Sequence, residues 1–169
     1  DAGLSFAVGK EGVYSLSGEA TWFDSYIDDW IVWLPTFKGF WTPMNIKEVH
    51  AYGVELKGDL NVQLARNWQL GIDGTFSWTP SINHGDPVDW ADEAIGKQLV
   101  YVPEYSAAVT GRLAYKSWRF LYKWCYYSER FTMTSNAFTY TGNVPYYLMN
   151  DVTLEKLFSA RWADFSVKA

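Results

Sequence analysis

The 169-residue sequence is poor in cysteine and histidine, and it contains no long apolar run. Its only cysteine, Cys125, cannot form an intramolecular disulfide. With His50 and His84 as the only histidines, the four ligands of a Cys/His zinc site cannot be assembled. No stretch approaches the ~20 apolar residues that a membrane-spanning helix needs. Disulfide scaffolds, zinc modules of this type and helical membrane proteins are therefore excluded.

Basic residues are outnumbered as well. The chain has 14 Lys and Arg against 19 Asp and Glu, which gives a net charge of −5. Nucleic-acid recognition needs a concentrated basic surface, so we expect no nucleic-acid partner. Aromatic residues, in contrast, make up 19% of the chain and hydrophobic residues 49%. That much buriable surface excludes a disordered chain, and the length fits one domain or a piece of something larger.

An alternation of apolar and polar residues dominates the sequence. Every even position from Tyr52 to Leu64 is apolar or glycine, and the odd positions are mostly polar. A period of two recurs in residues 68–78, 99–115 and 118–126. A helix, with 3.6 residues per turn, would not tolerate this pattern. The alternation predicts long antiparallel strands joined by tight turns at 65–67 and 116–117.

Extending the pattern predicts about eight strands. They lie near residues 4–8, 13–33, 45–64, 68–78, 99–115, 118–127, 146–158 and 162–169. The connections alternate between short (10–12, 65–67, 116–117, 159–161) and long (34–44, 79–98, 128–145), which puts all long loops at one end. A strand such as 52–64, tilted by ~40°, spans ~30 Å of height, against an apolar band of ~25 Å in outer-membrane barrels. We predict an all-β fold: an antiparallel up-and-down meander of long strands that is part of a large transmembrane β-barrel.

The alternation also assigns the two faces of the sheet. We expect Val54, Leu56, Leu60, Leu70 and Ile72 to face lipid, and Glu55, Lys57, Asp59, Asp73, Arg112, Arg119 and Lys123 to face the lumen. Aromatic residues gather at the strand ends, as in an interface girdle, although aromatics favour strands generally. They are Trp22, Phe23, Trp30, Trp33, Trp68, Trp78, Trp118, Trp124, Tyr146, Tyr147 and Trp162.

Several segments are similar to one known family. Tyr52 and the G-x-E of residues 53–55 stand at the top of a strand after a long loop, and more particular segments are 29–35 (DWIVWLP), 41–45 (WTPMN), 85–93 (GDPVDWADE), 95–99 (IGKQL), 101–105 (YVPEY) and 126–131 (YYSERF). Together they resemble the C-terminal part of the barrel of TonB-dependent outer-membrane receptors, in the cobalamin-receptor-like branch. The resemblance covers nearly the whole chain.

The resemblance implies a location in the outer membrane of a Gram-negative bacterium and energised import of a scarce, bulky ligand, with no covalent chemistry. Cobalamin is the ligand it favours, and an iron-siderophore or haem receptor is the alternative within the family. The implied partners are this ligand, outer-membrane lipid, the receptor's own plug and remaining strands, TonB acting through the plug, and a surface lipoprotein. Such barrels have ~22 strands. We therefore interpret residues 1–169 as a fragment of about eight strands, without the plug and the other strands.

The long loops supply the candidate ligand contacts. They are Trp33, Phe40, Trp41, Trp90, Tyr127 and Arg130. Stacking and apolar contact suit a large, flat, partly apolar ligand, and packing of the loops against one another is the competing role. Asp86, Asp89, Asp92 and Glu93 are of the type that binds calcium, but the fixed ligand spacing is absent. A solvated acidic loop is favoured, and no cofactor is expected.

Two readings from other classes compete with the receptor. A Ser/His/Asp hydrolase would need a serine beside His50 or His84, and the sequence has no G-x-S-x-G, so we predict that the protein is not an enzyme. A small closed β-barrel, lipocalin-like or an eight-stranded outer-membrane protein, fits the strand count. The first predicted strand is short and the last stops in mid-strand, which leaves no closing pair. A sheet whose first and last strands pair would favour the small closed barrel, and an open sheet would favour the receptor fragment.

Overall fold

The computed structural model describes residues 1–35, 38–87, 90, 93–137 and 142–169. Its strands are β1 (Ala2–Lys10), β2 (Tyr14–Pro35), β3 (Trp41–Ala65), β4 (Trp68–Trp78), β5 (Ser81–Asn83), β6 (Tyr105–Tyr115), β7 (Trp118–Tyr127), β8 (Arg130–Phe131), β9 (Asn143–Val144), β10 (Tyr147–Ala160) and β11 (Ala163–Lys168). Among these described residues, no helix has the length and apolar character to cross a bilayer.

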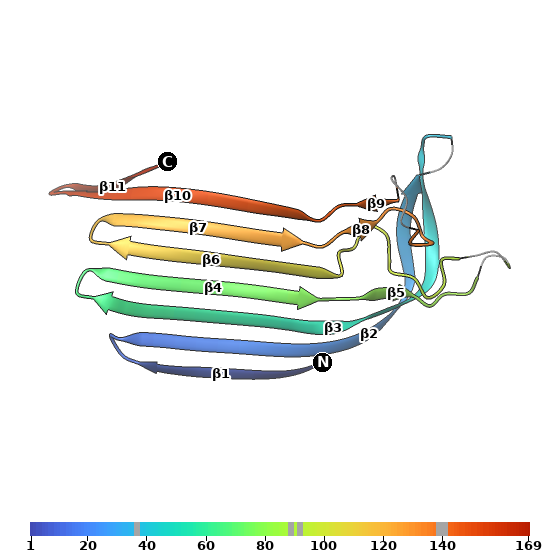
Figure 1. Cartoon of the computed structure of the whole chain (residues 1–169), viewed down its shortest axis with the longest axis horizontal. Helices are drawn as coiled ribbons and strands as arrows, with labels where there is room; N and C mark the ends of the chain where they lie inside the picture. The colour runs from blue at the N-terminus through green and yellow to red at the C-terminus, as the bar shows by residue number, and fades with distance from the viewer. Residues whose placement is uncertain (36–37, 88–89, 91–92, 138–141) are drawn as a thin grey trace.

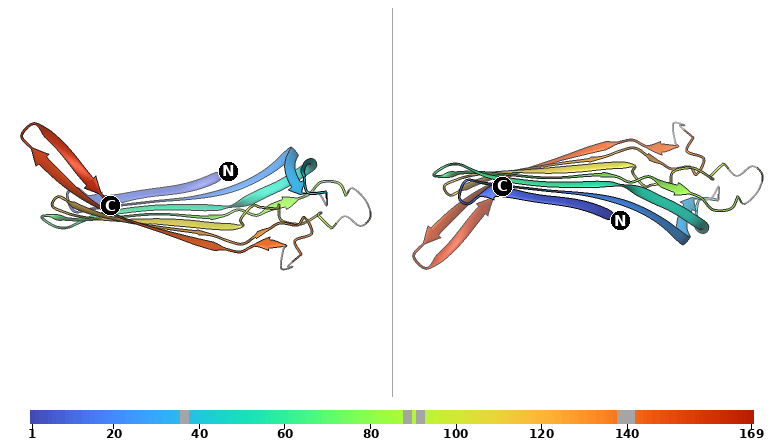
Figure 2. Two further views of the ribbon diagram at one scale, coloured as in Figure 1. Left: turned by 90° about the horizontal axis from the view of Figure 1, so that it is seen from above. Right: turned by 90° about the horizontal axis from the view of Figure 1, so that it is seen from below.

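The long strands form one antiparallel sheet in the order β1-β2-β3-β4-β6-β7-β10-β11, while β5 pairs with β3 and β8 pairs with β9. Tight turns join neighbouring strands at one end, and the long connections gather at the other (Figure 1). The predicted all-β meander is confirmed. Within the described part of the chain the sheet is an open single layer, with β1 and β11 at its two edges (Figure 2). An open sheet disfavours the small closed barrel.

The strand predicted at 99–115 is wrong in its first part, because β6 begins only at Tyr105. Leu99 and Val100 are buried, each 5% exposed, in the loop that precedes β6. Tyr101 then takes a left-handed conformation with φ of 62°. Pro103 has no N–H to donate to a ladder. Residues 99–103 are therefore apolar because part of this loop is buried. Periodicity alone cannot distinguish a buried loop segment from a strand.

The first two strands and the loop after them also differ from the prediction. β1 covers nine residues where the sequence pattern predicted strand only near 4–8. β2 and β3 continue pairing to Pro35 opposite Trp41, so the loop predicted at 34–44 shrinks to the few residues between them. The short strands β5, β8 and β9 were not predicted. All of them lie at the loop end (Figure 1).

The cross-strand register confirms the predicted division into two faces. Val54, for example, lies opposite Trp22 on β2 and Trp78 on β4. The same register places the apolar residues Leu4, Phe6, Leu16, Leu56, Leu60, Leu70, Ile72, Val109, Leu113, Phe120 and Leu154 on this face. The opposite, polar face carries Glu55, Lys57, Asp59, Asp73, Arg112, Arg119 and Lys123. Many large apolar side chains are exposed, because one sheet layer has nothing packed on its apolar face.

Aromatic residues border the apolar face at both ends. The turn-side belt consists of Tyr14, Trp68, Tyr115, Trp118, Phe158 and Phe165, and the loop-side belt of Trp22, Phe76, Trp78, Tyr105, Trp124 and Tyr126. On β4 the belts are ten residues apart, or ~33 Å along the strand, which a tilt of ~40° reduces to ~25 Å. Phe23 and Tyr147, which we predicted in the girdle, lie on the polar face instead, since they pair with Gly53 and Tyr127.

Candidate ligand-binding site

Ion pairs cross the strands on the polar face. Arg112 on β6 lies 2.5 Å from Asp73 on β4 and 3.6 Å from Asp59 on β3. Gly71 makes room for its guanidinium group, because a Cβ there would lie 3.0 Å from Arg112 Nε and 3.0 Å from Asn61 Oδ1. These charges are paired with one another across three strands of the sheet.

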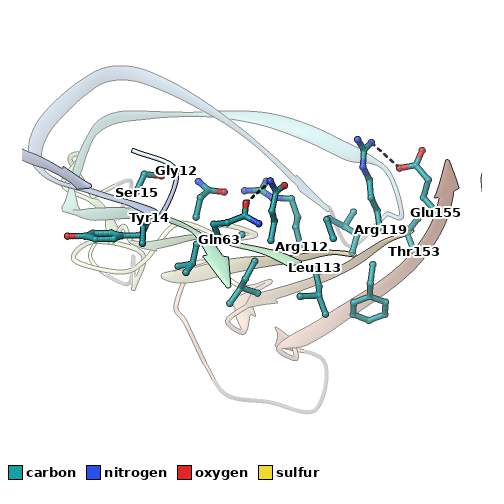
Figure 3. A pocket seen from close by; sticks show the side chains of 18 of the residues that line it. Gly12, Tyr14, Ser15, Gln63, Arg112, Leu113, Arg119, Thr153 and Glu155 are labelled. Carbon is teal, nitrogen blue, oxygen red and sulfur yellow. Dashed lines mark hydrogen bonds and ion pairs between the residues drawn. The ribbon is translucent and has the colours of Figure 1, made fainter. Parts of the chain in front are cut away.

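A second group of ion pairs joins the last three strands of the sheet. Glu155 lies 3.5 Å from Arg119 and 3.6 Å from Lys168. In Figure 3, Arg112, Gln63, Arg119 and Glu155 point to one side of the sheet and Leu113 to the other. A hollow of about 570 Å³ lies here, lined by residues from the first turn to β11. The polar face is thus the hollowed face of the sheet.

Two of the long connections at the other end form one assembly. The Gln98 N–H donates to Asn136 Oδ1 at 2.8 Å, and Asn136 Nδ2 donates back to the Gln98 carbonyl at 3.0 Å. The Tyr101 N–H donates to the Phe131 carbonyl at 2.8 Å. These bonds join the connection between β4 and β6 to the connection between β7 and β10. These connections, residues 79–104 and 128–146, are therefore folded against each other, and we call them the loop platform.

A small core and a polar turn support this platform from β3. Val49 is 1% exposed, and with Leu99 and Val100 it makes up the buried apolar set of the described residues. Asn83 lies at the end of β5, and its side-chain oxygen Oδ1 accepts a hydrogen bond from the Gly85 N–H at 2.9 Å. Its own N–H donates to the Lys97 carbonyl at 2.9 Å. Backbone groups in the loop are satisfied in this way without a long strand partner.

The structure brings one predicted contact residue against an aromatic partner. Trp41 opens β3, and its ring centroid lies 6.0 Å from that of Tyr101, with the planes tilted by 48°. Both rings are exposed. Because Trp41 begins β3 and Tyr101 lies in the connection between β4 and β6, the pair forms an exposed aromatic surface that spans these two segments.

Two further predicted residues meet around Tyr147. The Tyr127 ring at the end of β7 stacks on the Tyr147 ring, with centroids 5.0 Å apart and an interplanar angle of 17°. The Arg130 guanidinium lies 5.1 Å from the Tyr147 ring centroid. The Nε atom of Arg130 is buried and has no hydrogen-bond partner. This second group lies on the polar face, where the sheet meets the loops.

The other predicted contacts stand apart in the structure. Trp33 lies on β2 opposite Pro43, Phe40 directly precedes β3, and both are exposed. Trp90 is 98% exposed. These candidate contact residues are therefore exposed rings at the rim of the loop platform.

The acidic residues of the second long connection are only partly placed. Asp86 and Glu93 are exposed, whereas Asp89 and Asp92 lie outside the described residues. In the part of the chain that the structure describes, no three His, Cys, Asp or Glu side chains are grouped to hold a metal ion.

Sequence reasoning missed Tyr101, Tyr147 and a cluster around His50. The His50 ring stacks on Tyr26 with centroids 4.3 Å apart, and its Nε2 lies 3.0 Å from Asp24 Oδ1. The left-handed backbone conformation of Tyr101 is unusual for tyrosine, and such conformations cluster at functional sites. For Tyr101, the sequence offered two signals: Pro103, which interrupts an apolar run, and the segment 101–105 (YVPEY) that contains it.

Comparison with known proteins identifies the relatives of this fold. Residues 1–167 match the family model described as TonB dependent receptor-like, beta-barrel. Among solved structures, the chain is similar to BauA, the ferric preacinetobactin receptor from Acinetobacter baumannii, with a TM-score of 0.58 and 14% identity. That match covers 98% of this chain and 23% of BauA, so the chain spans about a quarter of that protein's length. No curated protein matches the chain in sequence.

Proposed function

The chain belongs to the TonB-dependent receptor-like β-barrel family, and from this premise we propose that it serves, as part of a larger barrel, in the import of a scarce, bulky ligand across the outer membrane of a Gram-negative bacterium. The observation that carries the proposal is the continuous apolar face of eight strands between two aromatic belts ~25 Å apart. The loop platform at one end supports ligand capture. The paired charges of the opposite face suit a lumen.

Cobalamin is the ligand we propose, because the loop and strand-end segments at 29–35, 85–93 and 126–131 resemble the cobalamin-receptor-like branch. The exposed rings of Trp41, Tyr101 and Trp90 offer the stacking surface that a large, flat ligand needs. A ferric siderophore is the second candidate, since BauA is a ferric preacinetobactin receptor. Haem is the third within this family.

The proposed partners follow from the same premise. The hollowed polar face would contact the receptor's own plug, and TonB would act on the barrel through that plug. The edges β1 and β11 would pair with the remaining strands of the parent barrel. A surface lipoprotein would approach the loop platform from outside.

Cysteine labelling of the full-length parent tests the membrane placement. We expect cysteines at Val54, Leu56 and Leu70 to resist a water-soluble maleimide, because lipid covers that face. Cysteines at the neighbouring polar positions Glu55 and Asp73 should label readily from the lumen. Equal labelling of both sets contradicts a membrane barrel, and an inverted pattern indicates a soluble barrel.

Alanine substitution in the loops tests ligand capture. Trp41→Ala and Trp90→Ala should each weaken cobalamin binding by cells that express the parent, by about 1 to 3 kcal/mol for each lost aromatic contact. Trp162, which is 87% exposed at a tight turn, provides the matched control, because Trp162→Ala removes the same ring at the opposite end. Binding of a ferric siderophore panel is measured in parallel. If both loop variants bind cobalamin as the parent does, at normal surface levels, cobalamin is the wrong ligand.

A further inference from the structure

The turn end of the apolar face carries a row of positive charges. Each tight turn has a basic residue within it or directly before it: Lys10, Arg66, Lys116 and Arg161. Another, Lys156, lies on the apolar face itself, since the register sets it opposite Trp118 on β7 and Val167 on β11. These basic residues therefore lie at the end of the sheet where the turn-side belt is, and the first turn also contains the acidic Glu11.

Hydrogen bonds bring two of these lysines together around Ser117. Lys156 Nζ donates to Ser117 Oγ at 2.7 Å, and the Leu157 N–H donates to the Ser117 carbonyl at 2.8 Å. The Lys116 N–H in turn donates to the Asn67 carbonyl of the neighbouring turn at 3.1 Å. Lys116 and Lys156 are thus held on two sides of one turn, and that turn is fixed to the next.

Aromatic rings of the belt hold both ammonium groups at the edge of the apolar face. Lys156 Nζ lies 4.5 Å from the Trp118 ring centroid and 6.0 Å from that of Phe158. Lys116 Nζ lies 5.2 Å from the Tyr115 ring centroid. An apolar stem that lies along rings while its ammonium group reaches the interface is the arrangement that lysine adopts at a membrane surface.

Neither ammonium group is neutralised by the protein. Among the described residues, neither Lys116 nor Lys156 forms an ion pair with a carboxylate. Glu155, the nearest acidic residue in sequence to Lys156, lies on the polar face, where it pairs with Arg119 and Lys168. An ammonium group has three donors, and Ser117 uses one of those of Lys156. Both lysines therefore retain donors for an anionic acceptor.

We propose that Lys116 and Lys156, with the rings of Trp118 and Phe158, form a binding site for the phosphate of an anionic phospholipid in the leaflet at the turn side of the barrel. The lysines donate charge-assisted hydrogen bonds to the phosphate oxygens. The acyl chains lie along Phe120 and Leu154, which are paired on the same face and exposed. The inference rests on the membrane placement in the proposed function, but it does not depend on which ligand is imported.

Native mass spectrometry of the delipidated full-length parent, titrated with dioleoylphosphatidylglycerol in detergent, tests the site. The double variant Lys116→Gln/Lys156→Gln should bind this lipid about 25-fold more weakly, at about fivefold for each lost charge. Lys57→Gln/Lys123→Gln removes the same charge from the polar face and should bind as the parent does. Lys116→Arg/Lys156→Arg should retain binding, which separates loss of charge from loss of fold.

Three outcomes would overturn the site: unchanged affinity in the glutamine variant, an equal loss in the polar-face control, or displacement of the lipid by inorganic phosphate at the same concentration. Phosphatidylethanolamine, with its own ammonium group, should bind more weakly than phosphatidylglycerol. Ligand uptake is measured on cells that express the same variants. A parent that imports ligand but retains no phosphatidylglycerol contradicts this inference alone, whereas one that retains the lipid but imports no ligand contradicts the proposed function.

Discussion

Replacing Gly53 with alanine should destabilise the full-length barrel by about 3 kcal/mol or more, the upper range for overpacking. A Cβ at this position would lie 1.9 Å from the Trp78 carbonyl oxygen and 3.2 Å from Thr79 Cα. Both are backbone atoms, which cannot rotate away as a side chain can. Gly53 also has φ of +158°, which L residues rarely adopt. Urea unfolding of the purified parent, followed by loss of the heat-modifiable band on a gel, measures the effect.

Gly58→Ala is the matched control, because it makes the same change five residues along the same strand. No heavy atom lies within 4 Å of a Cβ built there. The control should lower stability by less than about 1 kcal/mol, if at all. Equal unfolding midpoints for Gly53→Ala and Gly58→Ala would show that the close approach of Trp78 does not limit this strand.

The reason for a glycine at this place is a change of partner along β3. Residues 49–51 of β3 pair with β5, and from Val54, opposite Trp78, to Ala65 the strand pairs with β4. Between the two, the Tyr52 N–H reaches the Pro80 carbonyl at 3.1 Å. The chain of β4 therefore crosses close over residue 53 as it leaves the sheet. This gives the G-x-E of residues 53–55 a physical explanation that the sequence alone did not provide.

The regular part of the fold could be predicted from sequence because the residues of its two faces differ in polarity. Strands 68–78 and 118–127 were predicted with the bounds that the structure has. In each of these strands, successive residues belong to the apolar and the polar face in turn. Every position therefore contributes to a period of two in the sequence. The division of residues between the faces followed from the same pattern.

The loop platform could not be predicted in this way. Its contacts join residues far apart in sequence, such as Gln98 and Asn136, and they depend on backbone groups that every residue carries. Trp41 was predicted to lie in a long loop, whereas the structure places it, exposed, at the start of β3. Its partner Tyr101 was predicted to be part of a strand. Tyr147 was assigned to the girdle although it stacks on Tyr127 on the polar face. Irregular segments have no hydrophobic period, so their candidate ligand contacts could be chosen only by residue type.

The isolated 169-residue chain should not be a soluble monomer. Its accessible surface of 11927 Å² exceeds the ~8500 Å² expected for a folded globular monomer of its mass by about 40%. Much of the excess is the apolar face between the belts, which far exceeds the few hundred Å² of apolar patch that soluble monomers expose.

The strands β1 and β11 add two edges whose N–H and C=O groups have no ladder partner within the described sheet. Burial of that face and those edges has to come from detergent, from lipid, from further strands or from other copies of the chain. We therefore expect the isolated chain to be insoluble, detergent-dependent or oligomeric through edge pairing. Sedimentation equilibrium in detergent-free buffer decides this, with the same chain in detergent as the control. A monodisperse monomer of 19.4 kDa without detergent would mean that the sheet closes or refolds in solution, and the small soluble barrel would then be the better description.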